Sequence, residues 1–181
     1  MLGIGITGRN CAGQDTLADD LEACGFERHS LSDAIREELR ARGQEITRDA
    51  LIALGRELRE AEGPAVLAER MKRMIKTDRV ALVSVRSPAE IASLRELDGF
   101  VLVSVSAPVE VRYARELARA REGAGGTLEE FIAIEKREDS TNPNAQQLSA
   151  AIEMADTEIV NDGDRSALTR CVEVLLGELD V

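Results

Sequence analysis

Apolar and polar positions along the chain form two alternating kinds of segment. Short runs rich in β-branched residues are separated by longer segments in which apolar residues recur every three or four positions. The first kind is typical of buried strands and the second of amphipathic helices, so their alternation predicts a parallel sheet with crossover helices. The predicted strands are Leu2–Thr7, Phe26–Leu31, Val80–Val85, Phe100–Ser106 and Glu158–Asn161.

The segments between these strands carry the start and stop signals of helices. Gly25 and Gly43 follow periodic stretches, and Ser32 or Asp33 can cap the helix between them. The predicted helices are Gln14–Ala23, Ile35–Arg42, Thr47–Glu62, Pro64–Lys76, Pro88–Leu97, Pro108–Arg121, Thr127–Asp139, Ala145–Ala155 and Arg165–Leu179. Because no repeat or linker divides them, we expect a single α/β domain over residues 1–181.

Composition and charge exclude several classes of partner. The chain has 181 residues and is 44% hydrophobic, which is enough for one substantial core. Its 2% aromatic content leaves few platforms for stacking single-stranded bases, and its formal net charge of −11 opposes nonspecific binding to nucleic acids and anionic membranes. We therefore expect no nucleic-acid partner and no membrane partner.

The apolar runs and the cysteines indicate a cytoplasmic protein. A run such as Val101–Val105 is far shorter than the roughly 20 residues of a membrane helix, and the N-terminal residues lack a signal-peptide pattern. Cys11, Cys24 and Cys171 are odd in number and lack the spacing of a metal site. We expect reduced thiols, with no metal bound through them and His29.

A glycine-rich segment follows the first strand and leads directly into a helix. It reads GRNCAGQDT from Gly8 to Thr16 and has the place and length of a Walker A phosphate loop, G-x-x-x-x-G-K-[ST]. Gln14 replaces the lysine and Asp15 the hydroxyl residue, which shifts the charge by two units in the unfavourable direction. The phosphate-binding candidates are Gly8, Arg9, Asn10, Ala12, Gly13, Gln14, Asp15 and Thr16.

The loop by itself leaves two interpretations open. Backbone N–H groups and a helix N-terminus can bind phosphate without the lysine, but the same residues also suit a tight strand-to-helix turn without a ligand. Arg9 is a candidate to restore one of the two charges. Asp15 and Thr16 are candidate ligands of Mg²⁺, directly or through water.

Later segments favour the phosphate site because of their order. They read LSDAIREELRARGQEITRDALIALGRELREAEGP, VRSPAEI, APVEVRYARELARAR, TLEEFIAIEKRE and AIEMADTEIVNDG. With them, nearly the whole chain resembles the P-loop nucleoside monophosphate kinase-like proteins, namely the adenylate kinase-like and dephospho-CoA kinase-like group with the kinase-like domains fused to deoxycytidylate deaminases. The resemblance implies a P-loop NTPase three-layer αβα fold with a five-stranded parallel sheet of order 2-3-1-4-5. It also implies an acceptor-binding helical region at about 32–77 and a small helical lid at about 112–140.

The resemblance also implies roles for individual residues. Acceptor-binding roles fall on Asp33, Arg36, Arg59 and Arg86, and lid positions on Arg112, Arg115, Arg119 and Arg121. Gln14, Arg115 and Arg119 would have catalytic roles. The loop near the donor base would consist of Asn161, Asp162 and Gly163. Val83 departs from the pattern, because related proteins commonly have an acidic residue near that place.

Each arginine can also be a surface ion pair, because 31% of the residues are charged. Arg112, Arg119 and Arg121 favour that interpretation individually, whereas Arg86 follows a predicted central strand at the edge where α/β sheets bind ligands. For other acceptor-side arginines the two interpretations are balanced, and Asp33 fits a helix cap.

The implied function is ATP-dependent phosphoryl transfer, with Mg²⁺ accompanying ATP, to a nucleoside or deoxynucleoside monophosphate or a similar small acceptor. Arginines that converge on phosphates are the equipment such a reaction needs. Gln14 and Val83 support an alternative, a catalytically weak or inactive nucleotide-binding protein with a regulatory role. We favour the kinase because the acceptor and lid arginines are present, and the fold is compatible with a homodimer.

Overall fold

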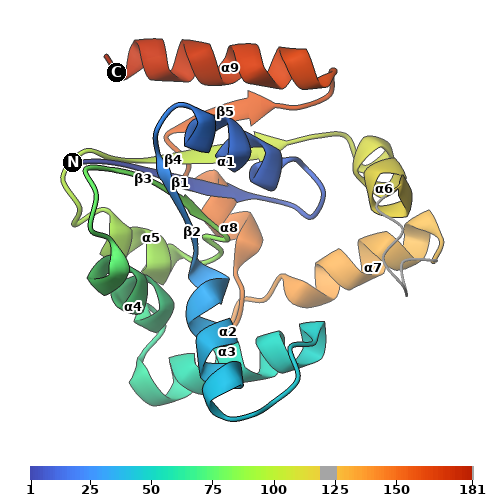
Figure 1. Ribbon diagram of the computed structural model, residues 1–181. Coiled ribbons are helices and arrows are strands. Elements are labelled where there is room, and N and C mark those ends of the chain that lie inside the picture. Colours follow the sequence, from blue (N-terminus) through green and yellow to red (C-terminus); the bar gives the residue numbers. More distant parts are fainter. Residues whose placement is uncertain (119–125, 181) are drawn as a thin grey trace.

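The computed structural model describes residues 1–118 and 126–180, and its strands form one parallel sheet. The strand order is β2-β3-β1-β4-β5 (Figure 1). The strands are β1 Leu2–Gly8, β2 Glu27–Ser30, β3 Arg79–Val83, β4 Phe100–Ser106 and β5 Thr157–Val160. The predicted sheet and strand order are therefore confirmed.

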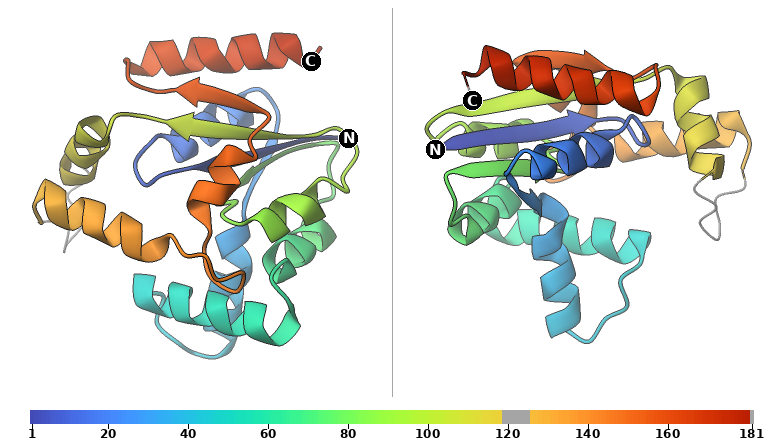
Figure 2. Two further views of the ribbon diagram at one scale, coloured as in Figure 1. Left: turned by 180° about the vertical axis from the view of Figure 1, so that it is seen from behind. Right: turned by 45° about the horizontal axis from the view of Figure 1, so that its top comes forward.

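Helices connect the strands and cover both faces of the sheet. They are α1 Gln14–Ala23, α2 Leu31–Ala41, α3 Arg48–Glu62, α4 Val66–Met74, α5 Pro88–Leu94, α6 Val109–Ala118, α7 Leu128–Glu138, α8 Leu148–Glu153 and α9 Arg165–Glu178. α1 and α9 pack on one face through a cluster that includes Ile4, Leu17 and Val172. α2, α3, α4, α5 and α8 share the other cluster, with Leu82 and Leu102 from the sheet. Figure 2 shows α8 on the face turned away from α9, which completes a three-layer arrangement.

The junction of β2 and α2 differs from the prediction. The strand ends at Ser30, and α2 begins at Leu31, before the predicted cap at Ser32 or Asp33. Ser30 is the N-cap, and Asp33 is the third helical residue of a capping box, because its carboxylate accepts from the Ser30 N–H at 3.1 Å. The prediction that Ser32 or Asp33 is the N-cap was wrong, because this reciprocal pair starts the helix earlier.

Other elements, among them β3, α4 and α8, are shorter than predicted. β3 ends at Val83, because Ser84 has φ 65 and leaves the extended conformation. α4 begins at Val66, after a turn that follows Gly63, and α8 covers only Leu148–Glu153. The sheet therefore ends where the polar residues of the candidate site begin.

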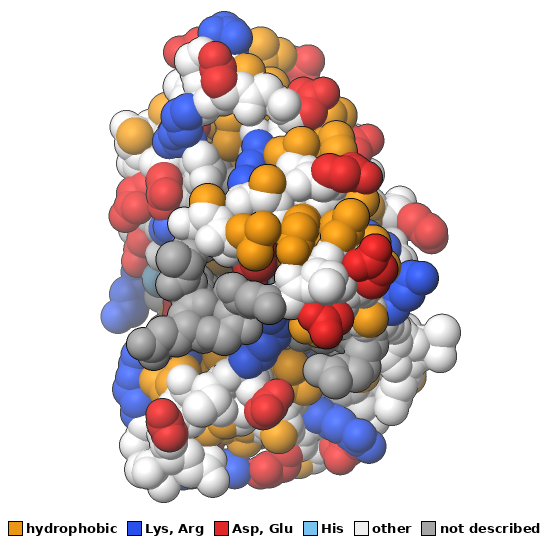
Figure 3. Space-filling view, turned by 90° about the vertical axis from the view of Figure 1, so that its right-hand side faces the viewer, with side chains coloured by type: hydrophobic (Ala, Val, Ile, Leu, Met, Phe, Trp, Pro, Cys, Tyr) orange, Lys and Arg blue, Asp and Glu red, His pale blue; other side chains and the backbone are white. Residues whose placement is uncertain are grey.

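The carboxyl ends of the strands point toward α6 and α7, which lie beyond that edge of the sheet (Figure 1). Figure 3 looks onto this side of the molecule and shows hydrophobic side chains beside acidic and basic ones. Leu117 of α6 and Ile134 of α7 are among the exposed large apolar residues. Within the described residues, no helix is long and apolar enough to cross a membrane.

Candidate functional site

Gln14, which stands at the place of the Walker A lysine, folds back over the loop between β1 and α1. Its Nε2 donates to the carbonyl oxygens of Gly8 at 2.5 Å and Arg9 at 2.9 Å. The Arg9 carbonyl also accepts from the Ala12 N–H at 3.1 Å. Gln14 therefore stabilises the conformation of the loop but brings no charge to it.

Two arginines of α6 bind the next carbonyl oxygens of the loop. Arg112 Nη1 donates to the Asn10 oxygen at 3.1 Å. Arg115 Nη1 lies 3.4 Å from the Cys11 oxygen and 3.3 Å from the Ala12 oxygen. Two of the four predicted lid arginines, Arg112 and Arg115, thus bind the backbone of the loop, and Arg119 and Arg121 lie outside the described residues.

Asn161, which follows β5, closes the far end of the loop. Its Nδ2 donates to the Ala12 oxygen at 2.7 Å, and its own backbone oxygen accepts from Arg115 Nη2 at 3.0 Å. Gly13 has φ 115, and a Cβ there would lie 2.2 Å from Asn161 Nδ2, so this position requires glycine. The predicted donor-base residue Asn161 therefore supports the loop, while Gly163 is not among the residues that line the cavity.

Side-chain donors engage the carbonyl oxygens of the loop. Every carbonyl oxygen from Gly8 to Ala12 lies within hydrogen-bonding distance of a side-chain nitrogen. A trans peptide directs its N–H away from its C=O, and the first N–H groups of a helix have no acceptor within it. Together with the positive end of α1, this arrangement favours an anion at the mouth of the loop.

Arg112 also joins the loop to both helices beyond the sheet. The residue is 5% exposed, and its guanidinium forms an ion pair with Glu135 of α7. The same group lies over the Phe131 ring, 5.6 Å from its centroid. Arg112 forms an ion pair, but a buried one rather than the predicted surface pair, and this pair holds α7 beside the loop.

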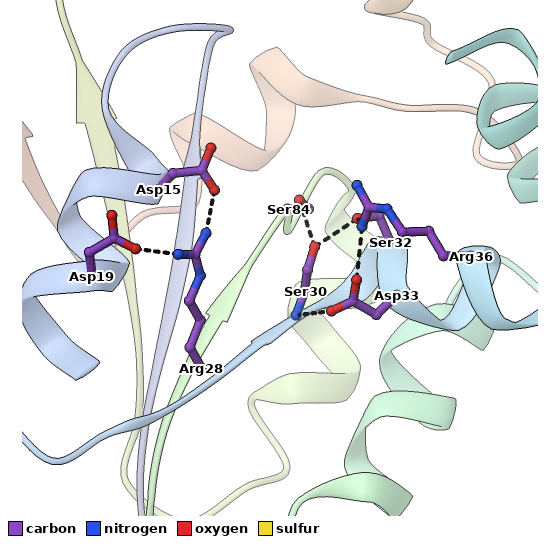
Figure 4. Close-up of polar contacts among 8 residues, drawn as sticks. All are labelled: Asp15, Asp19, Arg28, Ser30, Ser32, Asp33, Arg36 and Ser84. Carbon is purple, nitrogen blue, oxygen red and sulfur yellow. Dashed lines mark hydrogen bonds and ion pairs between the residues drawn. The ribbon is translucent and has the colours of Figure 1, made fainter. Parts of the chain in front are cut away.

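The structure does not bring Arg9 to the place of the lysine. Arg9 Nη2 donates to Ser149 Oγ of α8 at 2.9 Å and lies 3.8 Å from the Asp139 carboxylate. A different arginine lies at the helix that follows the loop. Arg28 of β2 forms ion pairs with Asp15, at 2.6 Å from Nη2 to Oδ1, and with Asp19 (Figure 4).

The two candidate magnesium ligands lie in different surroundings. Asp15 lines the cavity, but its carboxylate accepts from Arg28. Thr16 is not among the lining residues, and its carbonyl oxygen accepts from Arg165 at 3.1 Å. In the part of the chain that the structure describes, no three His, Cys, Asp or Glu side chains form a metal-binding group.

The loop opens into a cavity of about 1170 Å³ at the carboxyl ends of β1, β2 and β3. Among the described residues, five arginines and three carboxylates line it, and Asp19 and Glu90, outside the lining, also pair with two of these arginines. The arginines are Arg28, Arg36, Arg48, Arg59 and Arg86, and the carboxylates are Asp15, Asp33 and Glu116. Apolar side chains including Ile46, Ile52 and Ile134 also border it, so the cavity combines a positive lining with apolar walls.

Asp33 and Arg36, the two predicted acceptor-side residues of α2, form an ion pair with each other on its first turns. Arg36 Nη1 donates to Asp33 Oδ1 at 2.8 Å and to Ser32 Oγ at 2.5 Å. The Ser30 hydroxyl lies 2.7 Å from that of Ser32 and 3.1 Å from that of Ser84, the residue with positive φ (Figure 4). Hydroxyl groups, a carboxylate and a guanidinium therefore meet where β2 and β3 end.

Arg59 and Arg86 are both connected to one buried carboxylate. Glu90 is 0% exposed; its Oε1 accepts from Arg59 Nη2 at 3.0 Å, and its Oε2 accepts from the Arg86 N–H at 2.8 Å. The Arg86 side chain extends toward the loop before α8, where Nη1 donates to Gln146 Oε1 at 3.0 Å. Glu90 thus fixes the backbone from which Arg86 enters the cavity.

Some buried polar atoms around the cavity lack hydrogen bonds. Among the described residues these are Thr7 Oγ1, His29 Nε2 and Arg59 Nε, and all three residues line the cavity. His29 Nε2 does lie 2.9 Å from the Glu27 carboxylate, which is an ion pair when the imidazole is protonated. An unsatisfied buried polar group costs about 1–3 kcal/mol, so the Thr7 hydroxyl and the Arg59 Nε fit a polar ligand or water in the cavity.

Sequence reasoning missed Arg28, Glu90 and Glu116. Arg28 stands in a short edge strand of polar residues, and its charge was the one signal that could have found it. Glu90 reads as an ordinary first-turn acid of α5 although it is fully buried. Glu116 accepts from the Cys11 thiol of the loop at 3.0 Å, a contact between segments far apart in sequence.

The sequence comparisons assign the chain to a family. No family model matches the chain. A UPF0200 protein from Hyperthermus butylicus is 33% identical over 160 residues, which cover 87% of this chain and 83% of that protein. The chain belongs to the UPF0200 family. A UPF0200 protein from Pyrococcus abyssi is 29% identical over 182 residues, which cover 96% of this chain and 95% of that protein.

A third relative is longer than this chain. A UPF0200/UPF0201 protein from Archaeoglobus fulgidus is 31% identical over 183 residues, which cover 97% of this chain and 55% of that protein. The chain therefore spans about half the length of that relative.

Solved structures with the same fold include shikimate kinases. The enzyme from Bacteroides thetaiotaomicron matches with a TM-score of 0.65 and 15% identity, and the match covers 99% of both chains. The enzyme from Aquifex aeolicus matches with a TM-score of 0.56 and 15% identity, covering 98% of this chain and 97% of that one. The predicted P-loop kinase fold is confirmed, while the adenylate kinase-like and dephospho-CoA kinase-like assignment stays a prediction.

Proposed function

We propose that this UPF0200 chain binds the phosphates of ATP at the loop from Gly8 to Thr16 and transfers the γ-phosphoryl group to a small acceptor in the adjoining cavity. The acceptor class is a nucleoside or deoxynucleoside monophosphate or a similar small phosphorylated alcohol. The observation that carries the proposal is the loop itself. Its carbonyl oxygens from Gly8 to Ala12 lie against side-chain donors, and it opens into a cavity with a positive lining.

The charges around the cavity support an anionic ligand. A chain with a net charge of −11 repels anions at long range, whereas the arginines gathered at this cavity offer guanidinium donors to an anion locally, although carboxylates pair with Arg28, Arg36 and Arg59. Guanidinium groups are permanently charged and match the geometry of phosphate oxygens. The buried Arg59 Nε, which lacks a hydrogen bond, lies in the same lining.

The acceptor end of the cavity supports a polar ligand with hydroxyl groups or a phosphate. Arg36 and Asp33 lie beside the hydroxyl groups of Ser30, Ser32 and Ser84. Arg86 enters the cavity from the turn after β3, the edge at which open α/β sheets bind ligands. Phosphoryl transfer depends on positioning and charge stabilisation more than on covalent chemistry, and this set of groups can provide both.

A second candidate function is nucleotide binding with little or no catalysis, and Gln14 favours it. The neutral amide of Gln14 stands at the lysine position, and Arg115 is bound to carbonyl oxygens of the loop and to Asn161. The loss of one preorganised donor or cation in such a site typically costs about 10²–10³ in turnover. Such a protein would keep the loop, the cavity and the affinity for ATP.

Turnover measurements separate the two functions. The purified protein is incubated with ATP and a panel of nucleoside and deoxynucleoside monophosphates, with and without Mg²⁺, and ADP formation is followed. We expect ADP to form only with particular acceptors, and Arg86→Gln to raise the KM for the acceptor while ATP binding stays unchanged. Arg56→Gln is the matched control, because Arg56 is exposed, pairs with Glu60 and does not line the cavity.

Each outcome of this experiment has one meaning. ATP binding without ADP formation for any acceptor selects the second candidate function. The absence of ATP binding, measured by calorimetry on folded protein, contradicts both.

A further inference from the structure

The Arg28 guanidinium lies against the first two turns of α1, beside the phosphate loop. Its Nη2 is 2.6 Å from Asp15 Oδ1, and its Nη1 pairs with Asp19, one turn farther along the helix. Figure 4 shows the guanidinium between the two carboxylates. The Arg28 side chain is 29% exposed and lines the same cavity as Gly8 and Gln14.

Asp15 replaces the loop residue whose hydroxyl group would hold Mg²⁺ in a P-loop NTPase. Its carboxylate is engaged by the guanidinium, and a divalent cation that approached it would meet a permanent positive charge at hydrogen-bonding distance. Thr16, the next hydroxyl residue, is not part of the cavity lining. The residues around the loop therefore do not fit Mg²⁺ as a resident ion.

The charge of the loop also indicates a role for Arg28. Gln14 removes one positive charge relative to the usual pattern and Asp15 adds one negative charge, and Arg28 places one positive charge beside Asp15 in the first turn of α1. A guanidinium carries five N–H donors, so it can hold both carboxylates and still donate to a phosphate oxygen. Arg112 and Arg115 bind carbonyl oxygens of the loop.

We infer that Arg28 takes the place of the divalent cation, so that the loop binds a nucleoside triphosphate without Mg²⁺. This inference rests on the proposed function, because the ligand is the triphosphate of ATP. Arg28 is a binding residue that contacts the phosphate oxygens, and Asp15 and Asp19 are positioning residues that hold its guanidinium beside the loop.

An arrangement in which Mg²⁺ binds at Asp15 predicts a different effect of removing Arg28. If Mg²⁺ displaced Arg28 and bound Asp15, the arginine would compete with the ion, and its removal would leave ATP binding in Mg²⁺ unchanged or stronger. In the inferred arrangement, removal of the guanidinium weakens ATP binding both with and without the ion.

The test is calorimetric titration of ATP into the full chain in excess EDTA and in excess MgCl₂. We expect the wild-type protein to bind ATP equally well in both buffers. Arg28→Gln removes a charged donor and should weaken binding in EDTA about 10- to 100-fold. Arg28→Lys keeps the charge without the planar fork, so its affinity for ATP should lie between those of the wild type and Arg28→Gln. Arg56→Gln should bind ATP as the wild type does.

The comparison of the two buffers uses the wild-type protein alone and so does not depend on whether any variant folds. Thermal unfolding shows whether each variant is folded. Binding of ATP by the wild type only in MgCl₂ overturns the inference and leaves the proposed function standing. Unchanged or tighter binding by folded Arg28→Gln also overturns it. The absence of binding in both buffers overturns the inference together with the proposed function.

Discussion

Restoring a lysine at position 14 should strengthen nucleotide binding. Gln14 Nε2 lies 2.5 Å and 2.9 Å from two carbonyl oxygens of the loop, so its end is already at the mouth of the anion site. A lysine ammonium at the same place can donate to those oxygens and has a third N–H for a phosphate oxygen. Gln14→Lys therefore exchanges a neutral donor for a cation without requiring a new loop conformation.

The expected gain follows from the size of that change. Two unit charges about 4 Å apart interact by roughly 4 kcal/mol at an effective dielectric constant near 20, before the cost of removing water from them. Hydrogen bonds to charged groups contribute about 1.5–3 kcal/mol net, which corresponds to about 10- to 100-fold tighter binding of ATP. Larger gains would require the lysine to contact two phosphates.

The assay is a calorimetric titration of ATP into the wild type, Gln14→Lys and a charge control. Glu173→Gln is that control, because it changes the net charge by the same unit on the exposed surface of α9, away from the cavity lining. We expect the control to bind as the wild type does. Unchanged or weaker ATP binding by folded Gln14→Lys would refute the reasoning that a cation at position 14 strengthens phosphate binding.

Three further predictions concern stability. Gly13→Ala should destabilise the protein by about 1–3 kcal/mol or more and weaken ATP binding, because φ is 115 there and the new Cβ would meet Asn161; unfolding in denaturant and calorimetry measure both effects. Glu90→Ala should cost about 3–5 kcal/mol by leaving the buried Arg59 uncompensated, and a loss below about 1 kcal/mol in urea unfolding would contradict this. The pKa of Asp164, the N-cap of α9, is lowered by hydrogen bonds from a serine hydroxyl and a backbone N–H. The stability it adds is present above its unfolded pKa and lost as pH falls through its lowered folded pKa, so Asp164→Ala should lower the thermal midpoint more at pH 7 than in acid that protonates Asp164; an equal deficit at both pH values would exclude this explanation.

The fold could be predicted from the sequence because the local patterns and the family resemblance indicated the same fold. The β-branched runs marked the strands, and the glycine loop after β1 marked the edge of the sheet at which ligands bind. The predicted boundaries were wrong where reciprocal side-chain contacts decide them, as in the Ser30 and Asp33 capping box.

The site was harder to predict because it depends on long side chains from distant segments. Asp33 and Arg36, both predicted as acceptor-side residues, pair with each other because they lie on one helix turn. The directions of Arg9, Arg112 and Arg115 depend on which carbonyl or carboxylate each can reach in the folded chain. No local pattern contains that information.

The contact of Arg28 with Asp15 could not be predicted from a local pattern either. It joins an edge strand to the helix after the loop, and it forms only because β2 pairs with β3 in one register. A shift of that register by one residue would turn the arginine to the other face of the sheet.

The central claim is that the loop from Gly8 to Thr16 binds the phosphates of ATP. The most direct test is a titration of ¹⁵N-labelled protein with ATP, followed through the backbone amide signals. We predict that the largest chemical-shift changes fall on the amides of this loop and the first turn of α1, and that inorganic triphosphate reproduces them. Changes confined to other segments, or no changes at saturating ATP, would contradict the account.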